Sequence, residues 1–253
     1  MPDVVFKDLC IDVTAGEGRP EAVARFWSAA LNQPVVEHEG GDFHLEPPMG
    51  GSKERTIWIN GVPEQAAGKS RVHLDLRVPG GDPVPLIAAG GRVASEPGDG
   101  HPWYVLNDPD GVAVCVFGPH ASSPDGPTGP FELVVDAVDP ERIATWWAER
   151  TSGTVCRRPG AEFVWVEGAA GFPFMFWVFI SVPEPKTVKN RVHWDIKLAD
   201  ATVDDLVDAG ATLLRTRDGD IDWCRGRDAA PQTRRRGAVG SPHQGHRRGW
   251  RRQ

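Results

Sequence analysis

The segment KSRVHLDL at residues 69–76 decides the fold, because KNRVHWDI at residues 189–196 repeats it at an offset of 120. A single offset that holds at many positions indicates a tandem duplication. The chain is therefore interpreted as two related domains in series. The same offset superimposes further positions, among them Trp27 on Trp147, Leu86 on Leu206 and Trp103 on Trp223.

The repeat predicts domain boundaries. The domains are expected at residues 1–118 and 130–223, with a linker rich in turn formers at 119–129 and an irregular, arginine-rich tail at 224–253. Runs of alternating polar and apolar residues, such as VHLDLRV at 72–78, are typical of half-buried strands. Helix patterns separate some of these runs, and the predicted order is β-α-β-β-β, twice in each domain.

Charge and cysteine usage limit the function classes. The net charge is −7, but nine Arg against one Asp give residues 224–253 a charge of +8, which leaves −15 for residues 1–223. Residues 1–223 are acidic enough to repel the phosphate backbone of a nucleic acid. Nucleic acid is therefore not expected as a partner of this part of the chain. The sequence shows neither a signal peptide nor an apolar run long enough to span a membrane. Four scattered cysteines without a C-x-x-C pair favour a cytoplasmic protein.

Three motifs carry a family resemblance. They are ARFW at 24–27, the repeated segment at 69–76 and 189–196, and NDPDG at 107–111 before the last strand of the first copy. With these motifs the chain resembles the vicinal-oxygen-chelate superfamily, specifically the glyoxalase-like proteins grouped with bleomycin-resistance proteins and dioxygenases. The resemblance implies an α+β fold of tandem glyoxalase-like domains built of paired βαβββ modules.

The resemblance also implies a metal site whose ligands come from the first and last strands of each module. His73 and His193 match the family's second-module histidine ligand, and alternation places His73 and Asp75 on one polar face. On the first strands the ligand position is best matched by Glu132 and Asp8, which are also the candidate catalytic carboxylates. A slip of two residues would substitute Phe6 or Pro130, and Cys115 stands where the family usually has Glu.

The two domains are expected to pack as an intramolecular pseudo-dimer, with a homodimer as the other assembly that the resemblance allows. One cup would then hold Glu132, Ile180, His73 and Cys115, and the other Asp8, Asn60 and His193. Thiolate, imidazole and carboxylate favour zinc over magnesium, with iron, nickel or manganese as other candidates. The bland alternative is that the histidines only form hydrogen bonds, that Cys115 only packs, and that Asp8 and Glu132 are solvated charges.

Two functions fit these residues. The first is a small-molecule-binding protein with a degenerate metal site, which the −15 body favours for a cationic ligand. The second is a metal-dependent lyase, isomerase or dioxygenase that acts on a substrate with vicinal oxygens. A decayed copy without any ligand is the third interpretation. The candidate pocket residues are Trp58, Asn60, Asp75, Trp103 and Asp195.

The end of the second copy departs from the repeat. Where the first copy has VAVCVF at 112–117, the offset brings in QTRRRG at 232–237. Burying unpaired arginines costs several kcal/mol, comparable to the stability of a whole domain. The second domain is therefore expected to lack its last strand, either through a change of reading frame or because the segment is a genuine basic tail.

Overall fold

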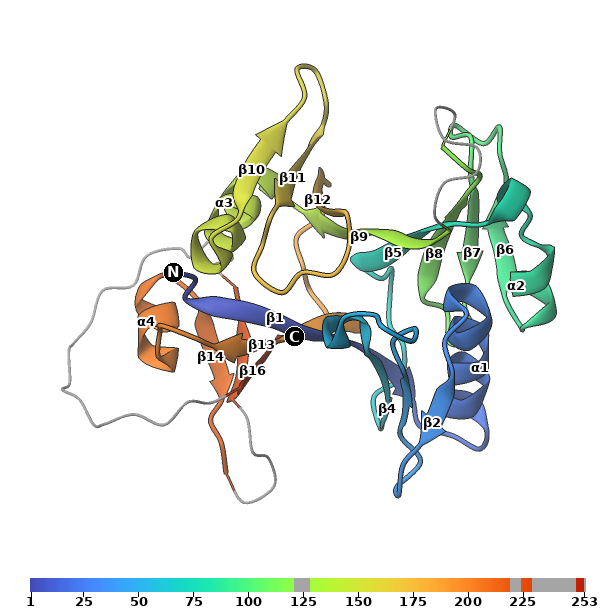
Figure 1. Ribbon diagram of the computed structural model, residues 1–253, viewed down its shortest axis with the longest axis horizontal. Coiled ribbons are helices and arrows are strands. Elements are labelled where there is room, and N and C mark those ends of the chain that lie inside the picture. The colour runs from blue at the N-terminus through green and yellow to red at the C-terminus, as the bar shows by residue number, and fades with distance from the viewer. Residues whose placement is uncertain (121–127, 219–223, 229–248, 253) are drawn as a thin grey trace.

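The computed structural model describes residues 1–120, 128–218, 224–228 and 249–252, and its strands form two eight-stranded sheets (Figure 1). The first module of domain 1 consists of β1 (Val4–Thr14), α1 (Arg19–Leu31), β2 (Val35–Glu37), β3 (Phe43–Leu45), the 3-10 turn η1 (Lys53–Arg55) and β4 (Ile57–Val62). The second consists of β5 (Val72–Arg77), the 3-10 turn η2 (Pro79–Gly81), α2 (Val84–Ala88), β6 (Arg92–Ser95), β7 (Tyr104–Asn107) and β8 (Ala113–Phe117).

Domain 2 repeats this order. Its first module contains β9 (Gly129–Ala137), α3 (Pro140–Thr151), β10 (Thr154–Arg157), β11 (Phe163–Glu167) and β12 (Phe176–Ser181). Its second module contains β13 (Val192–Leu198), α4 (Val203–Asp208), β14 (Thr212–Arg215), β15 (Cys224–Arg227) and β16 (Gly249–Arg252). The α+β class and the paired modules predicted from the repeat are confirmed.

Each sheet combines one module from each domain. The first sheet runs β14-β15-β16-β13-β1-β4-β3-β2, and the second runs β10-β11-β12-β9-β5-β8-β7-β6. The seams are antiparallel, between β1 and β13 in one sheet and between β5 and β9 in the other. The domains therefore exchange modules, and residues of both domains meet along each seam.

The first helix of each domain anchors its module through buried tryptophans. Helix α3 begins with Pro140, and the Asp139 side chain accepts a hydrogen bond from the backbone N–H of Arg142, which satisfies one free donor of the first turn. Its buried face presents Trp146 and Trp147 to the sheet. Burying such large side chains stabilises the fold by roughly 2–3 kcal/mol each.

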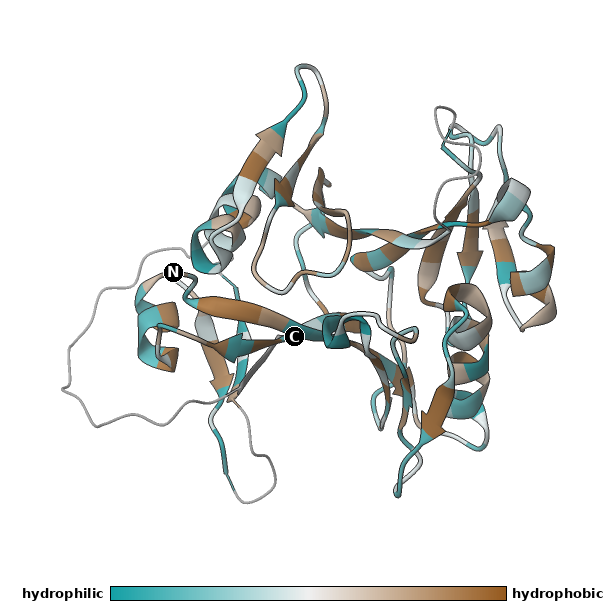
Figure 2. Ribbon diagram, in the orientation of Figure 1, coloured by the Kyte–Doolittle hydropathy of each residue, from teal (hydrophilic) through white to brown (hydrophobic). Residues whose placement is uncertain are grey.

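One continuous core joins the modules. Trp177 and Trp194, on strands of different sheets, are fully buried and meet edge to face, with ring centroids 5.0 Å apart. Trp147 contacts both rings. Hydrophobic colouring along β1 in Figure 2 marks a strand whose core-facing residues join this cluster. No helix in the described part of the chain is long and apolar enough to cross a membrane.

Each domain contains a tryptophan–aspartate hydrogen bond at the equivalent position. The indole N–H of Trp27 donates to Asp108 over 2.9 Å, and that of Trp147 donates to Asp228 over 3.0 Å. Both members of the second pair lie 120 residues after those of the first. The repeat therefore continues through β15 to Asp228, five residues beyond the predicted end of domain 2 at Trp223.

The predicted irregular tail at 224–253 is wrong for two short segments, which are the strands β15 and β16. Strand β15 pairs antiparallel with β14, as β7 pairs with β6. Strand β16 pairs antiparallel with β13, whereas β8 runs parallel to β5. The described residues of domain 2 thus include no parallel counterpart of β8, and residues 232–237, predicted to be unable to form it, lie outside them.

Candidate functional site

Strand β5 turns its polar residues away from the core. Its apolar positions join the buried cluster, and the intervening His73, Asp75 and Arg77 lie on the opposite face because strand side chains alternate. The His73 side chain retains 15 % of its exposure, so its imidazole does not lie in the helix-packed interior.

Four side chains from three strands meet there, and we call His73, Asp75, Cys115 and Glu132 the β5 site. Asp75 is opposite Cys115 in the register with β8 and opposite Glu132 in the register with β9. His73 Nε2 lies 3.3 Å from Asp75 Oδ1. The ligand atoms of His73, Asp75 and Cys115 all lie within 4.8 Å of one another. Glu132 comes from domain 2, so the site is shared between domains.

Two groups of the β5 site, the Glu132 carboxyl and the Cys115 thiol, have raised pKa values. Burial, followed by the charge of Asp75 and a hydrogen bond to it, raises the pKa of Glu132 to about 7, against a smaller opposing effect of Arg77. Burial and Asp75 also raise the pKa of the Cys115 thiol well above its usual range. Asp75 raises the pKa of this thiol, and Trp103 acts in the opposite direction. The negative charge of Asp75 thus disfavours ionisation of both Glu132 and Cys115.

The equivalent place in the other sheet is the β13 site, defined as Asp8, Cys10, His193 and Asp195. Ligand atoms of Cys10, His193 and Asp195 lie within 4.8 Å of one another, and all three residues are buried. Asp8 is opposite Asp195 in the strand register, as Glu132 is opposite Asp75. Asp8 and Glu132 are therefore structural equivalents.

A lysine distinguishes the two sites. Lys7 occupies a β-bulge at the β1–β13 seam, and its ammonium lies 2.7 Å from Asp8 and 3.4 Å from Asp195. The bulge at the β5–β9 seam carries Phe131 at the equivalent position. Bulges redirect side chains beside functional sites. The ammonium thus neutralises the carboxylates of the β13 site from within.

A lysine–aspartate ion pair lies beside each site. Lys189 lies 2.7 Å from Asp12, and Lys69 lies 2.6 Å from Asp136 in the equivalent position. Burial acts to raise the pKa of Asp12, but the charges of His193, Lys189 and Arg191 outweigh it and lower the pKa. Asp12 therefore stays ionised, and adds to the fixed charges around His193.

Aromatic rings line one side of the β5 site. Trp103 stacks on Phe117 with centroids 4.8 Å apart, and Phe117 meets Phe131 edge to face at 5.4 Å. The guanidinium of Arg77 lies 4.0 Å above the Phe131 ring. We call Trp103, Phe117 and Phe131 the aromatic wall, which offers flat apolar contact next to the polar cluster.

The remaining predicted positions are placed as follows. Trp58 and Asn60 lie opposite Cys10 and Asp12 in the β1–β4 register, and the Trp58 ring lies 5.0 Å from that of His44. Ile180 is opposite Asp136 rather than beside the β5 site acids. Phe6 is buried in the core, with an exposed fraction of 1 %. A slip that would make Phe6 a site residue is therefore wrong.

Sequence reasoning missed Lys7 and Cys10. Cys10 alternates with Asp8 and Asp12, so the strand period alone could have placed it on the polar face. The same period puts Lys7 on the opposite face from Asp8, and only the bulge brings its ammonium to the carboxylates. A single sequence gives no clear signal for that bulge.

The donor set of the β5 site fits a divalent cation. Imidazole, thiolate and carboxylate are the ligands of zinc, which binds them at about 2.0–2.3 Å. The ligand atoms of His73, Asp75 and Cys115 lie within 4.8 Å of one another, so small side-chain rotations would bring these three donors around one ion. A bound cation would stabilise the ionised forms of Cys115 and Glu132, whose pKa values burial and Asp75 raise.

Modules of the two domains thus share mixed sheets, and each seam carries a histidine and acids. The model of the glyoxalase-like domain family matches residues 8–117 and 132–234. The chain belongs to this family.

The fold is similar to that of one solved structure with a TM-score above 0.5, and two further structures match with lower scores. Glyoxalase I from Zea mays is similar, with a TM-score of 0.54 and 12% sequence identity over 84% of this chain and 83% of that chain. A putative dioxygenase from Bacillus subtilis has a TM-score of 0.48 and 13% identity over 89% of this chain and 70% of its own. A glyoxalase/bleomycin resistance protein/dioxygenase from Nocardioides has a TM-score of 0.33 and 19% identity, covering 49% of this chain and 89% of that protein. No curated protein sequence matches the chain.

Proposed function

We propose that the protein binds a small molecule at the β5 site, next to one divalent cation held by His73, Asp75, Cys115 and Glu132. The observation that carries the proposal is the convergence of nitrogen, sulfur and oxygen donors from three strands on one polar face. Zinc is the ion of choice, because magnesium has little affinity for thiolate.

A cation at this place supplies Lewis-acid polarisation of substrate oxygens. The chain's own residues supply the rest. The aromatic wall offers stacking contact for the apolar part of a ligand, and the Arg77 guanidinium above Phe131 is placed to bind an anionic group. Glu132 can hold or accept a proton at its carboxyl oxygen, which suits general acid–base work.

Binding without a cation is the second candidate. The aromatic wall favours it, because stacked rings beside buried carboxylates are suited to a flat cationic ligand. In that case the acids of the β5 site would bind the ligand's charge directly. A cytoplasmic location is part of either proposal and rests on four scattered cysteines without a C-x-x-C pair.

Metal titration separates the two candidates. Chelator-treated protein is dialysed against zinc and the bound metal is measured by mass spectrometry. The proposal predicts one equivalent of zinc per chain, lost in Cys115→Ser and retained in the matched variant Cys156→Ser, which alters a cysteine outside both sites. Absence of zinc from the wild type would reject the cation and leave metal-free binding.

A ligand screen follows on both forms. Thermal shift with catechols, thiol conjugates and cationic aromatic compounds is read with and without zinc. If oxygen-rich ligands stabilise only the zinc form, the metal-dependent proposal is supported. Stabilisation by cationic compounds in the chelated form would instead support the second candidate.

A further inference from the structure

One corner of domain 1 is closed by a buried carboxylate. The Asp110 side chain is only 1 % exposed, and its Oδ2 atom accepts a hydrogen bond from the backbone N–H of Thr14 over 2.9 Å. Arg191 donates to the same oxygen, and Arg19 donates to Oδ1 over 3.1 Å. Two guanidiniums and a backbone amide thus hold this acid, and Asp110 completes the corner.

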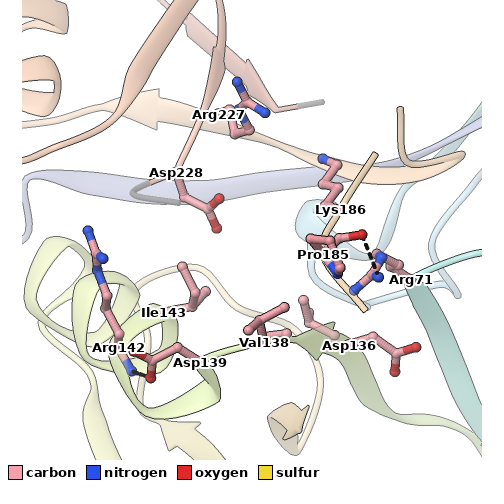
Figure 3. Close-up of a pocket in the computed structure, with 12 residues that line it drawn as sticks. Arg71, Asp136, Val138, Asp139, Arg142, Ile143, Pro185, Lys186, Arg227 and Asp228 are labelled. Atoms are coloured by element: carbon pink, nitrogen blue, oxygen red, sulfur yellow. Dashed lines mark hydrogen bonds between the residues drawn. The ribbon is translucent and has the colours of Figure 1, made fainter. Parts of the chain in front are cut away.

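The equivalent corner of domain 2 is a cavity of about 280 Å³ (Figure 3). Arg71 borders it and is the equivalent of Arg191 at the offset of 120. Asp228 also borders it and matches Asp108, which lies two residues before Asp110. At the position equivalent to Asp110 the sequence has Ala230, which carries no carboxylate.

Arg71 is held by the same kind of backbone contact as Arg191, although its domain has no counterpart of Asp110. Arg191 Nη1 donates to the backbone oxygen of Glu64 over 3.1 Å, and Arg71 donates to that of Glu184, the equivalent residue. Arg71 also donates to the oxygen of Pro185 over 3.0 Å, and both of these bonds leave from Nη2. Backbone carbonyls thus hold the Arg71 guanidinium beside the cavity. The equivalent Arg191 binds the Asp110 carboxylate instead.

The acids around this cavity already have partners. Asp136 is paired with Lys69 at 2.6 Å, Asp139 caps helix α3 through the N–H of Arg142, and Asp228 accepts from Trp147. The lining also contains four cationic residues and an apolar floor that includes Val138 and Ile143, both visible in Figure 3. The cationic residues of the lining are Arg71, Arg142, Lys186 and Arg227. A ligand with one carboxylate and a small apolar body matches this combination.

We propose that this cavity is a binding site for a small carboxylate, with Arg71 as its main anchor. The carboxylate would occupy the place that the Asp110 side chain occupies in domain 1. The site is separate from the β5 site and requires no metal.

The test uses benzoate and its neutral isostere benzamide, titrated by calorimetry into the chelator-treated full-length protein. Saturable binding of benzoate, and none of benzamide at the same concentrations, is expected. Arg71→Gln should weaken benzoate binding about tenfold or more, since it removes a charge-assisted hydrogen bond. The control Arg25→Gln, on the exposed face of α1, should leave the affinity unchanged.

A second variant keeps the test decisive if Arg71→Gln fails to fold. Val138→Asp places a carboxylate on the lining of the cavity, at a residue that is 48 % exposed. It should compete with benzoate and lower its affinity, while thermal stability stays the same or rises. Equal binding of benzoate and benzamide, no binding of either, or wild-type affinity in both variants would overturn the proposal.

Discussion

The β5 site and the β13 site are built on equivalent strands, yet they treat their buried carboxylates differently. In the β13 site the Lys7 ammonium lies between Asp8 and Asp195. In the β5 site Phe131 replaces the lysine, and the pKa of Glu132 rises to about 7 beside Asp75. A buried set of acids needs either protons or a cation. The β13 site has the Lys7 ammonium beside its acids, and our proposal gives the corresponding role at the β5 site to a bound divalent cation.

The largest expected effect concerns the frame that both sites share. Asp228→Ala removes the acceptor of the buried Trp147 indole and should lower the free energy of unfolding by about 2 kcal/mol. Asp108→Ala leaves the Trp27 indole and the backbone N–H groups of Asp110 and Val112 without their acceptor, and should cost about 3 kcal/mol or more.

Urea unfolding measures both variants against Asp200→Ala, which alters an exposed acid and should change stability by less than about 0.5 kcal/mol. A neutral effect of Asp228→Ala would mean that domain 2 ends before β15, as the sequence alone predicts.

The two histidines provide the next contrast. His73→Ala removes a nitrogen donor from the β5 site and should weaken zinc binding by about a hundredfold. His193→Ala should leave the zinc affinity unchanged, because Lys7 already neutralises the β13 site. Competition with a chromophoric chelator gives both affinities. Equal losses in the two variants would contradict the assignment of the cation to one site.

Exchanging the two bulge residues sharpens the comparison further. Phe131→Lys should place an ammonium near Asp75 and Glu132 and lower zinc affinity by roughly tenfold. Lys7→Phe removes the internal cation, and the β13 site should then bind a second, weaker equivalent of zinc. Metal stoichiometry by mass spectrometry is the readout. If Lys7→Phe still binds a single equivalent, the lysine is not what keeps metal from that site.

The smallest effect is expected at the aromatic wall. Trp103→Ala removes one ring of the stack. Affinity for an aromatic ligand found in the screen should fall by about three- to tenfold, the range of one stacking contact. Trp165→Ala, which alters a partly exposed ring outside the wall, is the control. A loss of the same size in both variants would contradict a specific role for the wall.

The repeat predicted much of the architecture, because duplicated motifs fix the same alternation of strands and helices in both domains. It also predicted which strands share a sheet: β5, β8, β9 and β12 are together, as the pseudo-dimer hypothesis requires. The offset of 120 fails on one strand, since Asp8 is equivalent to Glu132, 124 residues later. Domain 1 has a longer connection between β1 and α1 than domain 2 has between β9 and α3.

The rest of the site depended on local features that a pattern does not record. Lys7 reaches its carboxylates only through a bulge, and the sequence period assigns it to the wrong face. Asp228 was missed because the four residues between it and Trp223 differ from their counterparts in domain 1. Its sequence separation from Trp147 nevertheless equals that of Asp108 from Trp27. The first error concerns backbone geometry, and the second concerns residues that differ between the two copies.

A crystal soaked in zinc, with diffraction recorded at the zinc absorption edge, tests the difference between the two sites most directly. One anomalous peak is expected in each chain, among His73, Asp75, Cys115 and Glu132, with no peak between Cys10 and His193. A peak at the β13 site beside Lys7, or none at the β5 site, would contradict the account.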